Sequence, residues 1–97
     1  MTKPRVFRRE ADLERACVTV AHKRGFLTRK MNGRGFRAWP DRLVHWPRGG
    51  RMEYVELKLP GEEPTTLQAQ LHKRLRKRGF RVHVCDNYDH FLKILAA

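Results

Sequence analysis

Two β-rich runs separated by a turn sequence constrain the fold of this chain more than any other feature. Residues 41–46 (DRLVHW) and 51–59 (RMEYVELKL) favour strands, and PRGG lies between them at 47–50. Proline and glycine clusters of this kind form tight turns. The two runs therefore predict an antiparallel hairpin, in which Asp41 lies opposite Glu56.

The remaining segments predict three helices and two further strands, which gives an α/β chain of the order α-β-β-β-α-β-α. Apolar residues recur at helical spacing in three segments, and short β-rich runs follow the first two. The third strand, a crossover helix and the fourth strand form a βαβ unit, so we expect a mixed central sheet in one domain over residues 1–97. The predicted strands are at 26–31, 41–46, 51–59 and 80–86. The predicted helices are at 8–24, from a cap at 65 or 66 to 78, and from a start at 87 or 89 through Leu95.

The charge of the chain indicates a polyanionic partner. Lysine and arginine number 22 against 10 acidic residues, which gives a net charge of +12 and a pI near 10.9. Basic residues neutralise nucleic-acid phosphates without regard to sequence, so DNA is the expected partner. A membrane is not expected, because the basic residues are not gathered on one face of a helix. The N-terminus lacks the apolar stretch of a secretion signal, so we expect a cytoplasmic protein.

Acidic and basic side chains meet on the predicted hairpin. Glu56 and Lys58 are two residues apart in one strand and project from the same side, whereas Leu57 faces the other side. Such a pair alone is usually an ordinary ion pair. Asp41, which follows Pro40, adds a second carboxylate within metal-bridging reach. Magnesium prefers one or two carboxylates and completes its shell with water and phosphate, so this group predicts a divalent-metal site.

The order and spacing of these motifs resemble the PD-(D/E)XK nuclease signature. PD at 40–41, a gap at 42–55 and ELK at 56–58 form the match, and the wider chain is similar to the VRR-Nuc family. The similarity includes Glu14 in the first helix, LQ at 67–68 and RGFRVHVCD at 78–86. It implies a restriction-endonuclease-like core and a metal-dependent DNA endonuclease, with branched DNA such as Holliday junctions as the substrate.

The resemblance also implies which residues hold the metal. Asp41 and Glu56 would bind Mg²⁺ or Mn²⁺, the Leu57 carbonyl would be a further ligand, and Glu14 would reach the ion or its water from the first helix. No base stands one turn from Glu14, which favours this role over an ordinary helical ion pair. No organic cofactor is implied.

Two further residues complete the implied catalytic set. Lys58 would orient or deprotonate the attacking water and stabilise the developing charge, and Gln68 would support the site from the first turn of the second helix. His45 and His72 have no metal-site context and are interpreted as ordinary histidines. Cys17 and Cys85 are interpreted as buried, reduced thiols.

The loop before the PD motif departs from the family pattern. The family places a glycine close to PD, whereas residues 36–39 separate Gly35 from Pro40 here. Phe36 and Trp39 either stack on an unpaired base or tuck into the domain, and the sequence leaves both interpretations open. The predicted DNA contacts lie around this loop: Lys30, Arg34, Arg37 and Arg42.

Two other functions explain the charge equally well. The chain is then a non-catalytic nucleic-acid-binding module, or a subunit that targets a larger nuclease or helicase assembly. Neither gives a reason for PD, ELK and LQ to occur in this order. The resemblance further implies a homodimer in a bacterial or phage-infected cell, and the apolar residues with no predicted place in the core are candidates for its surface: Phe7, Trp46, Tyr54 and Phe91.

Overall fold

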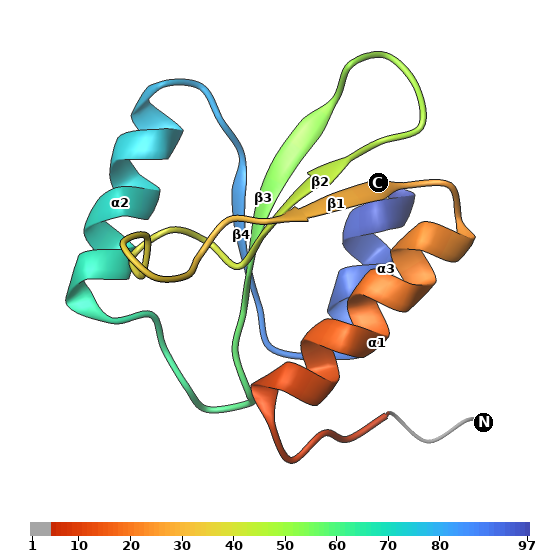
Figure 1. The fold of residues 1–97 in the computed structure, drawn as a ribbon, viewed down its shortest axis with the longest axis horizontal. Helices are drawn as coiled ribbons and strands as arrows, with labels where there is room; N and C mark the ends of the chain where they lie inside the picture. The colour runs from red at the N-terminus through yellow and green to blue at the C-terminus, as the bar shows by residue number, and fades with distance from the viewer. Residues whose placement is uncertain (1–4) are drawn as a thin grey trace.

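The computed structural model describes residues 5–97 and contains the predicted order of elements. A mixed sheet carries helices on both faces, so the expected fold class is confirmed (Figure 1). None of the helices in the described part of the chain could cross a membrane. The elements are α1 (Glu10–Lys23), β1 (Leu27–Lys30), β2 (Arg42–His45), β3 (Met52–Leu57), α2 (Thr66–Lys77), β4 (Val82–Cys85) and α3 (Tyr88–Ala96).

The sheet has the strand order β1-β2-β3-β4. The first three strands are antiparallel, and β4 runs parallel to β3 because α2 returns the chain to the same end of the sheet. Arg42 pairs with Val55 in the hairpin of β2 and β3. The next residue outward on each side is Asp41 and Glu56, so the predicted register is confirmed.

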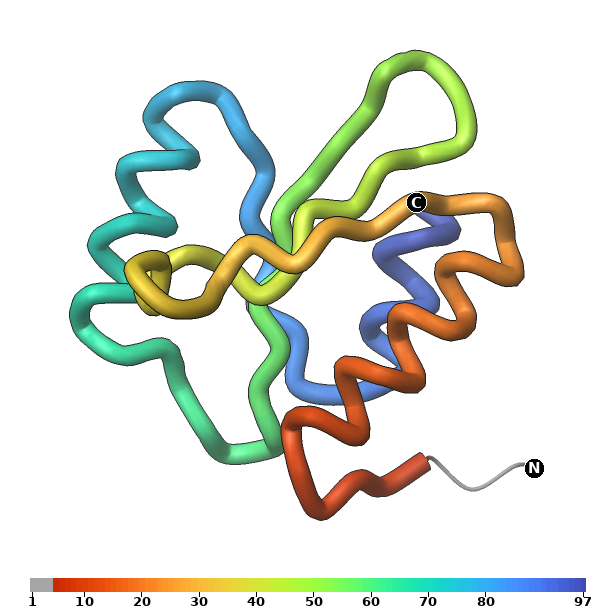
Figure 2. Tube along the Cα trace, in the orientation of Figure 1, coloured from red at the N-terminus to blue at the C-terminus, as the bar shows by residue number. Residues whose placement is uncertain are grey.

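The main core lies between the sheet and the helix pair α1 and α3. These two helices lie side by side although they come from opposite ends of the chain (Figures 1 and 2). Strand side chains alternate between faces, so every second residue of each strand points into this layer. The buried residues are Leu13, Cys17, Ala21, Phe26, Val44, Val55, Leu57, Cys85, Phe91, Ile94 and Leu95.

A second, smaller core lies between the sheet and α2. Tyr54, Leu75 and Val82 are buried there, and Trp39 and Leu71 pack against them. The helical spacing of Leu67, Leu71 and Leu75 predicts one buried face, but Leu67 is 68% exposed, so the prediction is wrong at this position. The buried face of α2 is rotated, so that Leu71, His72 and Leu75 point to the sheet.

The predicted dimer surface is wrong in two of its residues. Phe91 belongs to the main core and Tyr54 to the second core, since they are 2% and 8% exposed. Phe7 and Trp46 are half-buried and pack against the main core. The Trp46 ring meets Phe26 edge-on, with 5.3 Å between centroids.

Both cysteines are free and buried, as the sequence predicts. Burial, helped by the nearby Cys85 thiol, raises the pKa of Cys17 to about 12. The thiolate is the reactive form of cysteine, so a thiol with such a pKa is inert at physiological pH. Cys17 and Cys85 therefore act as small apolar core residues.

A capping box begins α2. The Thr65 hydroxyl accepts a hydrogen bond from the Gln68 backbone N–H at 3.2 Å, and the Gln68 side-chain oxygen accepts one from the Thr65 N–H at 2.8 Å. Thr65→Ala removes the first of these bonds, so we expect the free energy of unfolding to fall by about 1 kcal/mol. Urea denaturation of Thr66→Ala, in the first helical position beside it, is the control. Equal stability of the two variants would show that the cap contributes nothing.

Candidate active site

Two buried carboxylates, those of Asp41 and Glu56, lie together on the face of the sheet that α2 covers. Asp41 directly precedes β2, and Glu56 is near the end of β3. Asp41 is 7% exposed and Glu56 is 1% exposed. The hairpin register places them opposite each other, and strand alternation turns both to the side of Leu43 and Tyr54. The hairpin register predicted from the sequence therefore brings these two carboxylates together.

The side chain of Asp41 is held on both of its oxygens. Its Oδ2 accepts a hydrogen bond from the backbone N–H of Leu57 at 2.7 Å, and its Oδ1 accepts one from the side-chain amide of Asn32. The first bond ties Asp41 to the neighbouring strand, and the second ties it to the loop. Asn32 is a site residue that the sequence did not reveal.

Glu56 is protonated in the metal-free protein. Burial raises its pKa to about 9, and a hydrogen bond with Asp41 and the Asp41 charge raise it as well. The positive charge of Lys58 acts in the opposite direction and is outweighed. Two carboxyl groups at hydrogen-bonding distance cannot both ionise without a compensating cation.

Lys58 lies two residues beyond Glu56 and is 8% exposed. Its backbone N–H donates to the carbonyl of Cys85 at 2.9 Å, which fixes the chain just past the end of β3. Its ammonium charge lowers the pKa of Glu56, as expected for a cation beside the carboxylates. Asp41, Glu56 and Lys58 are therefore brought together as predicted.

His72 was interpreted as an ordinary histidine, but it contacts the site. Its ring is 1% exposed, and Nε2 lies 3.4 Å from Oε1 of Glu56. Burial lowers the pKa of His72, and the charges of Arg76 and Lys58 lower it further, so the ring is neutral. The missed signal is its place one turn after Gln68, on the same face of α2.

Glu10 is a further acid, near enough to Lys58 and Asp41 for their charges to act on it, that sequence reasoning missed. Burial raises its pKa, and although Lys58 opposes this rise, a hydrogen bond with Glu62 and the charges of Glu62 and Asp41 support it. Glu10 opens α1 one turn before Glu14, so helical spacing alone would have suggested it.

Glu14 is engaged in ion pairs on the sheet. Its Oε2 lies 2.7 Å from Nε of Arg42 and 3.5 Å from Nζ of Lys30. No base stands one turn from Glu14 in the helix, but β1 and β2 supply Lys30 and Arg42 as partners, which helical spacing did not predict. A direct role of Glu14 at the metal stays a prediction. Lys30 keeps 56% of its side chain exposed, whereas Arg42 keeps 21%.

Gln68 lies at the start of α2, where its carboxamide oxygen belongs to the capping box. Within residues 5–97, no hydrogen bond joins Gln68 to Asp41, Glu56 or Lys58. Its observed contribution to the site is therefore indirect, since it fixes the first turn of the helix that carries His72.

The loop at 32–39 carries two of the predicted DNA contacts and two aromatic residues. Arg34 and Arg37 are exposed, and Phe36 is 58% exposed. Trp39 is half-buried, and its ring centroid lies 6.2 Å from that of Tyr54. The loop thus tucks in one aromatic ring and presents the other to solvent.

The residues of the site fit a hard divalent cation. Asp41 and Glu56 supply the one or two carboxylates that magnesium prefers. The side-chain oxygen of Asn32, beside Asp41, is buried without a hydrogen-bond partner in the described chain. No group of three histidine, cysteine or acidic residues in residues 5–97 has the arrangement of an all-protein metal cage. A pair of carboxylates is the protein contribution that magnesium takes when water and substrate oxygens complete its shell.

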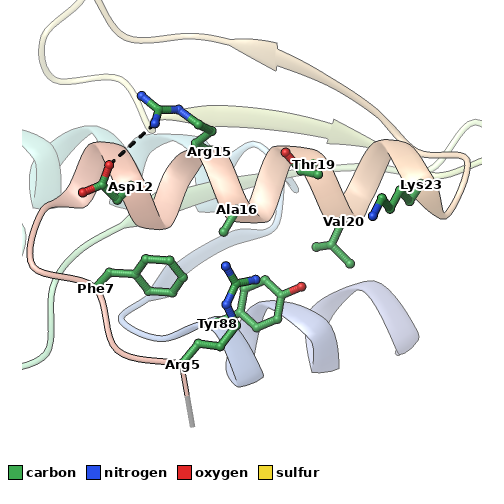
Figure 3. Close-up of a pocket in the computed structure, with 9 residues that line it drawn as sticks. All are labelled: Arg5, Phe7, Asp12, Arg15, Ala16, Thr19, Val20, Lys23 and Tyr88. Carbon is green, nitrogen blue, oxygen red and sulfur yellow. Dashed lines mark ion pairs between the residues drawn. The ribbon is translucent and has the colours of Figure 1, made fainter.

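A cavity of about 440 Å³ between α1 and α3 is separate from this site (Figure 3). The guanidinium of Arg5 lies 4.7 Å from the ring centroid of Tyr88, and Arg15 pairs with Asp12 at 3.7 Å. None of its lining residues belongs to the carboxylate group of Asp41 and Glu56.

Replacing Glu56 should stabilise the metal-free protein. The proton on Glu56 stabilises the folded state fully below its ordinary pKa of 4.5, and this contribution is lost as the pH rises toward about 9. In EDTA, the free energy of unfolding of the wild type should fall across this range by up to about 1.4 kcal/mol per pH unit. Glu56→Gln should lack this slope and be roughly 2 to 4 kcal/mol more stable at pH 7.5.

Glu53 is the matched control on the same strand. Burial raises its pKa, but hydrogen bonds from Arg51 and His83, both at 2.6 Å, outweigh burial and lower it. Glu53→Gln should therefore destabilise the protein, by about 1 to 3 kcal/mol. Denaturation curves at pH 5 and pH 8 decide the matter, and a destabilised Glu56→Gln would contradict the carboxyl pairing.

Comparisons with known proteins agree with this site. No family model matches the chain. The chain is 41% identical over 81 residues to protein p44 of Acyrthosiphon pisum secondary endosymbiont phage 1, named as a candidate nuclease, and the match covers 84% of this chain and 86% of p44. A solved VRR_NUC domain superposes with a TM-score of 0.79 at 31% identity, covering 90% of this chain and 94% of that domain. With its sequence and fold both matched over most of their length, the chain belongs to the VRR-Nuc family of nucleases.

Proposed function

We propose that this nuclease is a divalent-metal-dependent endonuclease that hydrolyses phosphodiester bonds in DNA. The observation that carries the proposal is the buried pair Asp41 and Glu56, with Lys58 beside it. Desolvated carboxyl groups held in contact have a high affinity for a cation, because a cation removes their repulsion. A structural ion pair would not need the second acid.

The metal would be held by Asp41, Glu56 and the carbonyl of Leu57. When bound, a divalent ion polarises the phosphate and lowers the pKa of a water. Binding requires Glu56 to release the proton that it holds in the metal-free protein. The Leu57 N–H and the Asn32 amide keep Asp41 in place during this change.

Lys58 and His72 complete the proposed chemistry. The Lys58 ammonium orients the attacking water and stabilises the negative charge that develops on the phosphate. His72 is neutral and contacts Oε1 of Glu56, so its ring limits the orientations available to that carboxylate. Glu10 adds a further acid at the start of α1.

DNA is the proposed substrate because of charge and its distribution. The net charge of +12 favours a polyanion. Arg29, Arg34 and Arg37 are exposed on β1 and on the loop that is bonded to Asp41. The positive charge of these residues offsets the charge of the carboxylates, which would otherwise repel phosphate.

Asp41→Asn tests the catalytic proposal. Asparagine keeps an oxygen that can accept the Leu57 N–H but loses the charge that holds the metal, so cleavage should fall at least a thousandfold. DNA binding should be unchanged or tighter, because one repulsive charge is gone. Cleavage of labelled DNA with Mg²⁺ or Mn²⁺ and titration of the same DNA in EDTA measure these two effects. Electron paramagnetic resonance of Mn²⁺ measures the loss of metal binding.

The control for this experiment is Asp89→Asn, an exposed acid in the first turn of α3. It should bind Mn²⁺ and cut DNA as the wild type does. Wild-type cleavage by Asp41→Asn, or cleavage that persists in EDTA, would overturn the proposal. DNA binding by the wild type with no cleavage under any metal would favour the non-catalytic module.

We further propose that the enzyme acts as a homodimer on branched DNA. A row of side chains crosses the α2 face of the sheet beyond the helix: Leu27 pairs with His45, and His45 pairs with Met52. Leu27 is 71% exposed, Met52 is 42% exposed and Phe80 is 36% exposed. Phe80 and Met52 line the same cavity. The exposed apolar residues Leu27, Met52 and Phe80 form the proposed dimer surface, in place of the buried Tyr54 and Phe91. A two-fold dimer would present two active sites to a symmetric junction.

Met52→Glu tests the dimer. A charge in the apolar row should dissociate it, because burying an unpaired carboxylate is costly. Light scattering at micromolar concentration should then give a mass near 11.5 kDa, whereas the wild type should give twice this mass. Leu67→Glu, at an exposed leucine of α2, is the control and should remain dimeric. A monomeric wild type would contradict the proposal.

A further inference from the structure

A cavity of about 380 Å³ lies beside the active site, between β1 and the loop at 32–39. This volume is at the low end of the range for small-molecule sites, and a single planar ring system fits such a space. Apolar and basic side chains line it together: Arg29, Lys30, Met31, Phe36, Trp39 and Leu43.

The floor of this cavity is part of the second core. Met31, Trp39 and Leu43 pack against the buried group of Tyr54, Leu75 and Val82. The floor is therefore held in place by the sheet and by α2, and its shape exists before any ligand binds. A preformed apolar floor lowers the cost of ordering on binding.

One wall of the cavity is the aromatic ring of Phe36, which is not packed in either core. Phe36 is 58% exposed, although Trp39, three residues later, is tucked against Tyr54. A turn in the loop, closed by the bond from the Phe36 N–H to the Gly33 carbonyl at 2.9 Å, positions this residue. Phe36 therefore offers a ring face to a ligand.

Two hydrogen bonds connect the residues around the cavity directly to Asp41. The Met31 N–H donates to the Asp41 carbonyl at 3.0 Å, and the Asn32 amide donates to the Asp41 side chain. Trp39 precedes Pro40 and Asp41 in sequence. A ligand in the cavity thus lies next to the position of the reacting phosphate.

The charges around the cavity restrict the kind of ligand. Arg29 and Lys30 line it, and Arg34 and Arg37 are exposed on the same loop. An apolar, aromatic space surrounded by cations suits a flat ring attached to phosphates on both sides. A nucleobase within a DNA strand has this chemistry.

We propose that this cavity receives one unpaired nucleobase of the DNA substrate, next to the phosphate that is cut. A base inside a duplex must first be unstacked and unpaired, which costs free energy, so the cavity favours DNA with an unpaired nucleotide near the cleavage site. The proposal rests on the proposed nuclease function and names the substrate class of that same site. Phe36 supplies the stacking face, and Arg29 binds the flanking phosphate.

Fluorescence of 2-aminopurine tests the cavity without requiring cleavage. The probe is placed at an unpaired position of a branched DNA and mixed with wild-type protein in EDTA. Stacking against Phe36 should quench the fluorescence. Phe36→Leu should abolish the quenching and weaken binding of this DNA about tenfold, since aromatic stacking contributes about one factor of ten or more per base. Phe36→Trp should restore both.

Two controls accompany this experiment. Leu67→Ala removes an apolar side chain of similar exposure outside the cavity and should quench as the wild type does. A fully paired duplex carrying the same probe should bind wild type and Phe36→Leu equally. Equal quenching by wild type and Phe36→Leu, or equal weakening for paired and unpaired DNA, would overturn the proposal.

Cleavage assays with Mg²⁺ separate this inference from the proposed function. If the wild type quenches the probe but cuts no DNA, the nuclease proposal fails and the base-binding cavity stands. If it cuts paired and unpaired DNA at the same rate and Phe36→Leu does so too, the cavity proposal fails and the nuclease proposal stands.

Discussion

The contact between the carboxyl groups of Asp41 and Glu56 is unfavourable by itself, so the surrounding hydrogen-bond donors and strand pairing have to stabilise it. Each acid is nearly inaccessible to water, and burial and mutual repulsion together raise the pKa of Glu56 to about 9. The surrounding structure compensates with donors, since the Leu57 N–H and the Asn32 amide bind Asp41. The hairpin register holds the two acids together regardless of their repulsion, because β2 is paired on both sides.

Glu53 and Glu56 show that position on the strand does not decide the state of a glutamate. Both are buried in β3, on opposite faces of the sheet, yet their pKa values move in opposite directions. Glu53 meets Arg51 and His83, which stabilise its charge. Glu56 meets another acid and a neutral histidine, and Lys58 only partly offsets the cost. The strand thus contains one glutamate that stabilises the fold and one that is available for chemistry.

Sequence patterns predicted what depends on local order and missed what depends on the rotation of helices. The hairpin register follows from turn length and strand alternation, so the grouping of Asp41, Glu56 and Lys58 could be predicted from the order of residues alone. Leu67 and His72 could not be placed, because a small rotation of α2 exchanges a buried leucine for a buried histidine. The partners of Glu14 come from strands that are distant in sequence, and helical spacing contains no information about them.

Selection of the DNA substrate has to arise outside the carboxylate group. In the proposed function the carboxylates and Lys58 would act on a phosphodiester, which is identical in paired and unpaired DNA, so they would not distinguish DNA structures. Discrimination requires side chains that reach beyond the phosphate to the base. The loop at 32–39 is bonded to Asp41 and extends away from it, and residues 36–39 are the segment by which this chain departs from the family pattern. Phe36 is the exposed aromatic residue of that segment, so a change there would alter which DNA is cut without altering how it is cut.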